Sequence, residues 1–204
     1  FKLSCDKIDN DNCSKIMNVL PSPETCQVIS YNKCRAIIEA LKINPSITRV
    51  YLGHVYFGDL GALELANFLK TNNTINELLL AYNKVTAEGC AALIETLRTN
   101  STLTYLNLDE VTQIEPRCIR KMLEKNTTLK RLVLGKDMVK LDDLPFLAVA
   151  LWENYSLTEF LVFFSKRANL ALSKSKSANF ALMDAAMRRN NAILSHQRET
   201  LEMF

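Results

Sequence analysis

The sequence predicts an α/β fold: a right-handed solenoid in which a parallel β-sheet lines the concave side of an arc and α-helices line the convex side. Three observations predict it: a recurring phrase around an asparagine, apolar residues at helical spacing before it, and alternating apolar residues after it. A fixed period of roughly 20–50 residues is typical of stacked repeats. Because a helix is about 10 Å wide and strands lie about 4.8 Å apart, stacking such units curves the array.

The repeated asparagines follow one another at intervals of 28, 28, 26, 28 and 36 residues. They are Asn44, Asn72, Asn100, Asn126, Asn154 and Asn190. A helix that ends needs a residue that tolerates the left-handed conformation, and asparagine is the usual substitute for glycine there. We therefore expect each asparagine to end a helix in this conformation.

Apolar residues stand three and seven positions before most of these asparagines, which places them on one stripe of a helix. The pairs are Leu65 with Leu69, Leu93 with Leu97, Ile119 with Leu123, and Leu147 with Leu151. The expected helix starts follow capping signals. These signals are Asp59, Thr86, the pair Thr112 and Glu115 before Pro116, and the pair Asp142 and Asp143.

Apolar residues also follow each asparagine, three, six and eight positions on, and the last two have the period of a strand with one buried face. They are Ile47, Val50 and Leu52; Ile75, Leu78 and Leu80; Leu103, Leu106 and Leu108; Leu129, Leu132 and Leu134; and Leu157, Phe160 and Val162. Strands that recur after one helix each form a parallel sheet.

The two ends of the chain fit the repeat poorly, and we expect them to cover the ends of the core. Residues 1–33 form the predicted N-terminal cap, 34–189 an array of about five units, and 190–204 a C-terminal cap. Within the first cap, residues 9–20 are expected to form a helix and residues 26–30 a strand. Cys34 and Cys90 occupy the repeat slot that also holds Ala62, so both are expected to be buried.

The phrase NTINELLLAYNKVTAEGCAALIETLRTN resembles a leucine-rich repeat of the ribonuclease-inhibitor type, with Ile75, Leu78, Leu80 and Asn83 in the pattern L-x-x-L-x-L-x-x-N. The resemblance covers roughly residues 34–190. The closing DAAMRRNNAILSHQRETLEMF resembles, more loosely, the end of tropomodulin-like arrays. One departure is clear: the asparagine that ends this pattern, and that forms a ladder from repeat to repeat in the family, is present only at Asn83. The equivalent positions hold Val55, Val111, Asp137 and Ser165.

Composition and motifs argue against several function classes. The chain of 204 residues is 48% apolar and 23% charged, as expected for one folded domain, and its net charge of +3 is too small to indicate nucleic acid binding. Its longest apolar run, LPFLAVALW, is too short to span a membrane. It has two histidines, no closely spaced cysteine pairs and no glycine-rich phosphate loop. We therefore expect no enzyme activity, no cofactor and no metal.

The six cysteines favour reduced thiols and a cytoplasmic location, which for a bacterial effector would be the host cytosol. A disulfide within the first 34 residues remains the alternative if the protein is secreted. The chain begins at Phe1, as a processed product or an excerpt of a longer protein would.

The predicted concave face holds the candidate binding residues. Residues at alternate positions of the strands are expected to point outward there and to bind a partner protein. They are Arg49, Tyr51, Glu77, Leu79, Tyr105, Asn107, Arg131, Val133, Glu159, Leu161 and Phe163. The first row alternates in charge, which suits a partner with matched opposite charges. The second row mixes aromatic and aliphatic side chains, as interface anchors do.

Residues 166–189 are locally basic. Lys166, Arg167, Lys174 and Lys176 belong either to a solvated loop or to a patch for an acidic partner or lipid head groups. Phe163 and Phe164 are covered either by the chain itself or by a partner.

The sequence therefore predicts a monomeric, non-enzymatic scaffold that grips a partner protein on its concave face. The resemblance implies three alternatives: an activator of a small GTPase, an actin-capping protein of the tropomodulin type, and the targeting domain of a bacterial effector or immune receptor.

Overall fold

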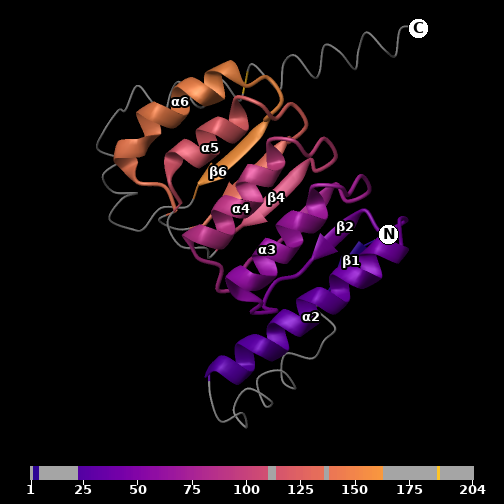
Figure 1. The fold of residues 1–204 in the computed structure, drawn as a ribbon. Helices are drawn as coiled ribbons and strands as arrows, with labels where there is room; N and C mark the ends of the chain where they lie inside the picture. Colours follow the sequence, from indigo (N-terminus) through magenta and orange to yellow (C-terminus); the bar gives the residue numbers. More distant parts are fainter. Residues whose placement is uncertain (1, 5–22, 110–113, 136–137, 163–187, 189–204) are drawn as a thin grey trace, which may run out of the picture.

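The computed structural model describes residues 2–4, 23–109, 114–135, 138–162 and 188, and in them helices alternate with parallel strands. The helices are α2 (Pro23–Ile43), α3 (Gly58–Leu69), α4 (Ala87–Leu97), α5 (Pro116–Leu123) and α6 (Leu144–Glu153), with a short 3₁₀ turn, η2 (Leu141–Asp143), before α6. The strands are β1 (Lys2–Ser4), β2 (Arg49–Tyr51), β3 (Glu77–Leu79), β4 (Tyr105–Leu108), β5 (Arg131–Leu134) and β6 (Glu159–Val162). Figure 1 shows the helices following one another along one face of the sheet.

The sheet has six parallel strands in the order of the sequence, and its register follows the period of the asparagines. Arg49 pairs with Glu77, Glu77 with Tyr105, Tyr105 with Arg131, and Arg131 with Glu159. These five residues are the first row predicted from the sequence, so the predicted register is confirmed. The face of the sheet that turns away from the helices is called the open sheet face below.

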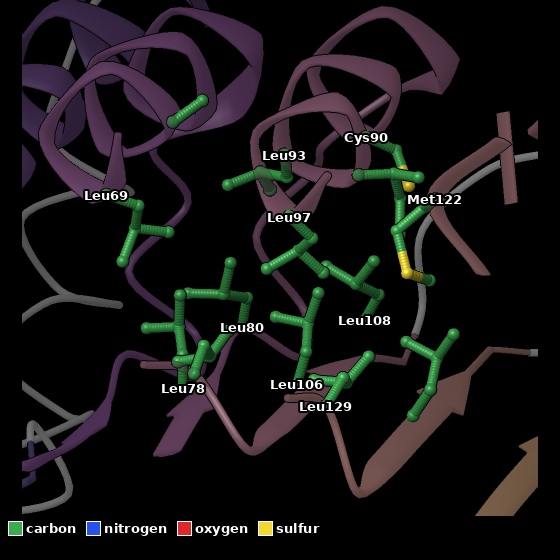
Figure 2. Close-up of a cluster of buried hydrophobic side chains, with 14 of the residues drawn as sticks. Leu69, Leu78, Leu80, Cys90, Leu93, Leu97, Leu106, Leu108, Met122 and Leu129 are labelled. Atoms are coloured by element: carbon green, nitrogen blue, oxygen red, sulfur yellow. The ribbon is translucent and has the colours of Figure 1, made fainter. Parts of the chain in front are cut away.

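Leucines from strands and helices fill the space between the two layers. Leu78, Leu80, Leu106 and Leu108 are at most 1% exposed, as are Leu69, Leu93 and Leu97 of the helices. Figure 2 shows these two sets pointing toward each other. Cys34 and Cys90 are fully buried, as their shared slot predicts, and burial raises the pKa of the Cys90 thiol to about 12. In the described residues, no helix is long and apolar enough to cross a membrane.

The prediction of left-handed asparagines is wrong at the five described positions, and Asn190 lies outside the described residues. Among the described residues, the non-glycine residues with positive φ are His54, Tyr56, Tyr82 and Lys84, and they lie after β2 and β3 rather than after the helices. The asparagines act through their side chains instead. Asn100 Oδ1 accepts the backbone N–H groups of Thr102 and Leu103, at 3.0 and 2.8 Å, which turns the chain from helix into strand.

The same asparagines also join neighbouring repeats. Asn100 Nδ2 donates to the carbonyl of Leu69 at 2.8 Å, Asn126 Nδ2 to that of Leu97 at 2.6 Å, and Asn154 Nδ2 to that of Leu123 at 2.8 Å. These three asparagines are at most 6% exposed. A buried carboxamide with all its partners supplied is favourable, whereas an unpaired one is costly. We call this row of corners the helix-to-strand edge.

The opposite row of corners, the strand-to-helix edge, is less regular. Asn83 is fully buried, its Oδ1 accepts the N–H groups of Val55 and Tyr56 at 2.9 Å, and its Nδ2 donates to the carbonyls of Leu52 and Leu80. The next positions of this ladder, Val111, Asp137 and Ser165, lie outside the described residues. Asn83 thus makes here the kind of bonds that a run of asparagines makes at the other edge.

The predicted helix starts are partly correct. Thr86 caps α4 with its side chain, and Pro116 lies in the first turn of α5. Asp59 falls inside the first turn of α3, and its carboxylate accepts the N–H of Thr86 at 2.7 Å and that of Gly89 at 3.2 Å. It therefore caps the next helix rather than its own. Glu115 and Asp143 precede α5 and α6 without a side-chain capping bond, and Thr112 lies outside the described residues.

The N-terminal segment differs from its prediction. Residues 26–30, the expected strand, are part of α2, because the helical segment begins at Pro23 and continues to Ile43. The strand that extends the sheet at this end is β1, which pairs with β2. Residue 34, the expected start of the array, falls within α2. The expected helix over 9–20 lies outside the described residues, and so do residues 189–204, which include the C-terminal cap.

Candidate functional site

The open sheet face presents the side chains that alternate with the core leucines. Arg49 and Arg131 are exposed, and Tyr51, Glu77, Leu79, Tyr105, Asn107 and Glu159 are half-buried. Leu161 is 40% exposed. The strands position these residues because successive side chains of a strand point to opposite faces. The parallel register then brings equivalent residues of neighbouring strands side by side.

Side chains on this face pair with one another across the strands. Arg131 Nε lies 2.5 Å from Glu159 Oε2, and Arg131 Nη2 donates to Glu159 Oε1 at 3.0 Å. The guanidinium also lies 4.4 Å above the centre of the Tyr105 ring. The prediction treated these charges as contacts for a partner, whereas the fold already uses Arg131 and Glu159 for each other. A partner would meet a pre-arranged and nearly neutral cluster.

A second pair joins β2 to β3. The Tyr51 hydroxyl donates to Glu77 Oε2 at 3.1 Å. Burial, followed by this hydrogen bond to Glu77, raises the pKa of Tyr51 above its usual value. The tyrosine therefore remains a neutral donor at physiological pH.

Val133 was predicted to point outward as a partner-binding residue, but it is buried. It is 4% exposed, and β5 is buried at three successive residues, Leu132, Val133 and Leu134. Its in-register neighbours are Asn107 and Leu161. A partner that touches this part of the face would meet those two neighbours. Phe163 and Phe164, with Lys166, Arg167, Lys174 and Lys176, lie outside the described residues.

Sequence reasoning missed the aromatic residues on the strand-to-helix edge. The rings of His54 and Tyr82 stack with centres 4.4 Å apart and an angle of 6° between them. They are 28 residues apart and share a positive φ, of 59° and 60°. A left-handed histidine or tyrosine is costly. The sequence signal was Asn83, whose side chain holds the loop that carries His54.

A cavity of about 500 Å³ lies between the C-terminal ends of α2 and α3. Ile38, Leu41 and Phe68 line it together with the amides of Asn67, Asn72 and Asn73. Asn72 Nδ2 donates to Thr74 Oγ1 here, whereas the later asparagines donate to the preceding repeat. The Asn72 corner is therefore less tightly joined to its preceding repeat than the three later corners are. Among the described residues, no cluster of His, Cys, Asp and Glu could hold a metal ion.

Solved structures share this arrangement of strands and helices. The structure of leiomodin-1 actin-binding site 2 matches with a TM-score of 0.65 at 20% identity, over 81% of this chain and 94% of that one. The C-terminal domain of tropomodulin from Caenorhabditis elegans matches with a TM-score of 0.59 at 16% identity, over 82% and 98%. The fold is that of these leiomodin and tropomodulin domains.

Sequence similarity points to the same proteins. Leiomodin-2 of Mus musculus is 30% identical over 134 residues, which are 60% of this chain and 24% of that protein. Leiomodin-1 of Homo sapiens is 35% identical over 101 residues, or 46% and 16%. The chain thus spans less than a quarter of these relatives. No family model matches the chain. Of the two resemblances seen in the sequence, the looser one, to tropomodulin-like arrays, is the one that the comparisons support.

Proposed function

We propose that this chain is a non-enzymatic repeat domain that binds actin. The observation that carries the proposal is the match to leiomodin-1 actin-binding site 2, which extends over 94% of that chain and is accompanied by detectable sequence similarity to leiomodins. Fold alone does not determine function, so the proposal needs a surface with suitable chemistry. We favour actin over the GTPase-activator, bacterial-effector and immune-receptor alternatives because the matches in both structure and sequence are to leiomodins.

We propose further that the repeats form a right-handed arc and that its concave side, the open sheet face, binds the partner. Helices need more width than strands, which supports this curvature. Tyr51, Leu79, Tyr105 and Leu161 supply aromatic and aliphatic area, which is typical of interface anchors. Arg131 and Glu159 hold each other in place, so binding does not require them to be ordered first.

We expect the domain to act as a monomer in the cytoplasm, where actin is found. The direct test is co-sedimentation with filamentous actin, together with analytical ultracentrifugation with monomeric actin. The double variant Tyr105→Ala, Arg131→Glu removes a ring and reverses a charge at the centre of the open sheet face. Tyrosine and arginine dominate interface energetics, so we expect the affinity to fall by about tenfold or more.

The matched control is Leu60→Ala, Lys70→Glu, which makes similar changes on the exposed side of α3. It should bind actin like the unchanged chain. Thermal unfolding of both variants checks that the loss of the Arg131–Glu159 pair has not unfolded the domain. If neither form of actin binds the unchanged chain, actin is not the partner. If actin binds and the double variant binds equally well, the surface is misplaced although the partner is right.

A capping function is the finer alternative that the sequence resemblance suggested. It predicts that substoichiometric protein slows growth at the pointed ends of filaments whose barbed ends are blocked. If pointed ends grow at the usual rate when the protein saturates its binding to actin, the domain binds actin but does not cap filaments.

A further inference from the structure

The outward residues of α6 differ in kind from those of the preceding helices. Counting from the corner asparagine, the position five residues back holds Glu39, Asn67, Glu95 and Lys121 in α2 to α5, and the position two residues back holds Lys42, Lys70, Arg98 and Glu124. In α6 these positions hold Val149 and Trp152. Polar side chains are thus replaced by apolar ones in two outward positions of this one repeat.

Larger apolar residues also stand on both sides of this pair: the position of Phe146 holds Ala36, Glu64, Ala92 and Cys118 in the earlier helices. The position after the corner asparagine holds Pro45, Asn73, Ser101 and Thr127 in earlier repeats and Tyr155 here. Phe146 lies three residues before Val149. Phe146, Val149 and Trp152 follow one another at intervals of three, which places them along one side of α6, and Tyr155 comes two residues after the helix ends. Phe146 is 36% exposed, Val149 and Trp152 are 44% exposed, and Tyr155 is 62% exposed.

A contiguous apolar row on the surface is costly in water and marks an interaction site. Trp152 and Tyr155 each make a further interaction within the molecule, yet they keep these exposed fractions. Tryptophan, tyrosine and phenylalanine are also the residues enriched at interface centres. The row has the composition of a docking surface, and we call it the α6 apolar row.

The neighbouring helix determines the charge of the expected partner. Arg117, Lys121 and Lys125 are exposed and follow one another at intervals of four along α5 and the turn after it. α5 packs against α6, and Arg120 lies between the two, with its guanidinium 4.8 Å from the centre of the Phe146 ring. Arg120 also pairs with Glu124, at 2.8 Å. The basic row therefore runs along the outer side of α5, and this ion pair lies between it and α6, whose axis is ~8–10 Å away as in other packed helices.

The other charges near α6 favour a protein over a lipid surface. Asp142, Asp143 and Glu153 lie at the two ends of α6 and would be repelled by an anionic membrane. An amphipathic helix meets only one flank, so it can place acidic residues over α5 and apolar residues over α6 without facing the carboxylates. Helices docked in this way contact their partner with residues at i, i+3, i+4 and i+7.

We propose that the α6 apolar row, together with Arg117, Lys121 and Lys125, binds an amphipathic helix of a partner protein that is acidic on one flank. This surface lies on the helical side of the molecule, away from the open sheet face. The proposal therefore does not depend on actin binding, and the two can fail separately.

Trp152 is the single tryptophan of the chain and lies in the row, so its fluorescence reports the site directly. The probe is a model helical peptide of about four turns with leucines at i, i+3, i+4 and i+7 and glutamates on one flank. A second peptide carries lysines in place of the glutamates. We expect the acidic peptide to shift the Trp152 emission to shorter wavelength in a saturable way, and the basic peptide to bind about tenfold or more weakly.

Two variants test the two halves of the surface. Val149→Glu introduces the glutamate that α4 carries at the same position, so the variant should fold. Its affinity for the acidic peptide should be about tenfold lower than that of the unchanged chain. Lys121→Glu, Lys125→Glu should exchange the preference and bind the basic peptide better than the acidic one. A merely structural role of these residues would not produce that exchange.

Three results would overturn the proposal. One is an absence of saturable fluorescence change with the acidic peptide. The second is equal binding of both peptides by the unchanged chain. The third is an emission shift with phosphatidylserine vesicles but not with the peptide, which would assign the surface to membranes.

Discussion

The helix-to-strand edge and the strand-to-helix edge both turn the chain between a helix and a strand, but they stabilise the turn in different ways. At the helix-to-strand edge, Asn100, Asn126 and Asn154 repeat one set of hydrogen bonds, and each joins its own repeat to the one before. At the described part of the strand-to-helix edge, Asn83 bonds one loop and Asp59 caps one helix, and the backbone is left-handed at four described residues that are not glycine. A regular edge keeps the repeats in register, which leaves the other edge free to vary.

The two edges also differ in role: we expect the helix-to-strand edge to contribute more to stability and the strand-to-helix edge to contribute more to binding. At the regular edge, Asn100, Asn126 and Asn154 are buried and have their hydrogen bonds made within the chain. The irregular edge carries exposed aromatic side chains such as Tyr82, which is 44% exposed. Loops on a rigid scaffold are where binding residues usually occur. Substitutions at the two edges should therefore have unequal effects on stability, and the following predictions go from the largest expected effect to the smallest.

Asn100→Ala should be the most damaging change. It leaves the N–H groups of Thr102 and Leu103 and the carbonyl of Leu69 without partners in a buried place. We expect the free energy of unfolding to fall by about 3–5 kcal/mol. Urea denaturation followed by circular dichroism measures it. A loss below about 1 kcal/mol would mean that the buried side chain does not hold the regular edge together.

Asn83→Ala should cost less, about 2–4 kcal/mol, although Asn83 is as deeply buried. Its bonds hold a single loop, at Val55 and Tyr56, and the carbonyls of Leu52, Leu80 and Ala81 beside it. Native-state hydrogen exchange should show faster exchange at Val55 and Tyr56 and unchanged exchange at Leu103. Equal acceleration at all three amides would contradict the view that the two edges are independent.

Asp59→Ala should cost about 1–2 kcal/mol, the usual loss for a helix cap with a charged acceptor. Its carboxylate serves the exposed end of α4, where water can replace part of the interaction. Thermal unfolding measures the effect. Asp59→Asn should recover part of it, because the side chain keeps one oxygen that can accept. An Asn variant no better than Ala would show that charge alone matters.

Lys84→Gly should have the smallest effect, and the opposite sign. Lys84 has a φ of 55°, which glycine adopts without strain, so we expect a gain of up to about 1 kcal/mol after the entropy that glycine loses on folding. The matched control is Lys70→Gly, where φ is −58° and glycine should cost about 0.5–1 kcal/mol. Chemical denaturation measures the change in the free energy of unfolding for both variants. If both variants were destabilised, the backbone at Lys84 would not be strained.

Much of this fold could be predicted from spacing alone. The intervals between asparagines fixed which residues pair across the sheet, from Arg49 to Glu159, because a parallel sheet of repeats must align equivalent positions. Leu106 and Cys90 are buried as their slots required. Spacing determines which residues share a position, and burial at a shared position is nearly uniform in a stacked core.

The candidate site was harder to predict because it depends on contacts between unlike residues. The pairing of Arg131 with Glu159 and the ring of Tyr105 beneath it arise from side chains of three strands, and a row of alternating charges shows only that such pairing is allowed. Val133 is aliphatic like Leu79 and Leu161, yet it is buried where they are not. The corner asparagines were mispredicted for a similar reason. Asparagine suits a left-handed turn, but its side chain can equally form hydrogen bonds that join two repeats, and the sequence does not distinguish these roles.

The corner asparagines have a consequence for how the protein can be made. Asn72, Asn100, Asn126 and Asn154 each stand two residues before a threonine or serine, the sequence that oligosaccharyltransferase recognises. In Asn100, Asn126 and Asn154 the atom that would carry the sugar, Nδ2, is buried and donates to carbonyls of the preceding repeat. A glycan attached there before folding would block the junction between repeats. Material from a secretory expression host should therefore misfold, and a host without this modification should be used.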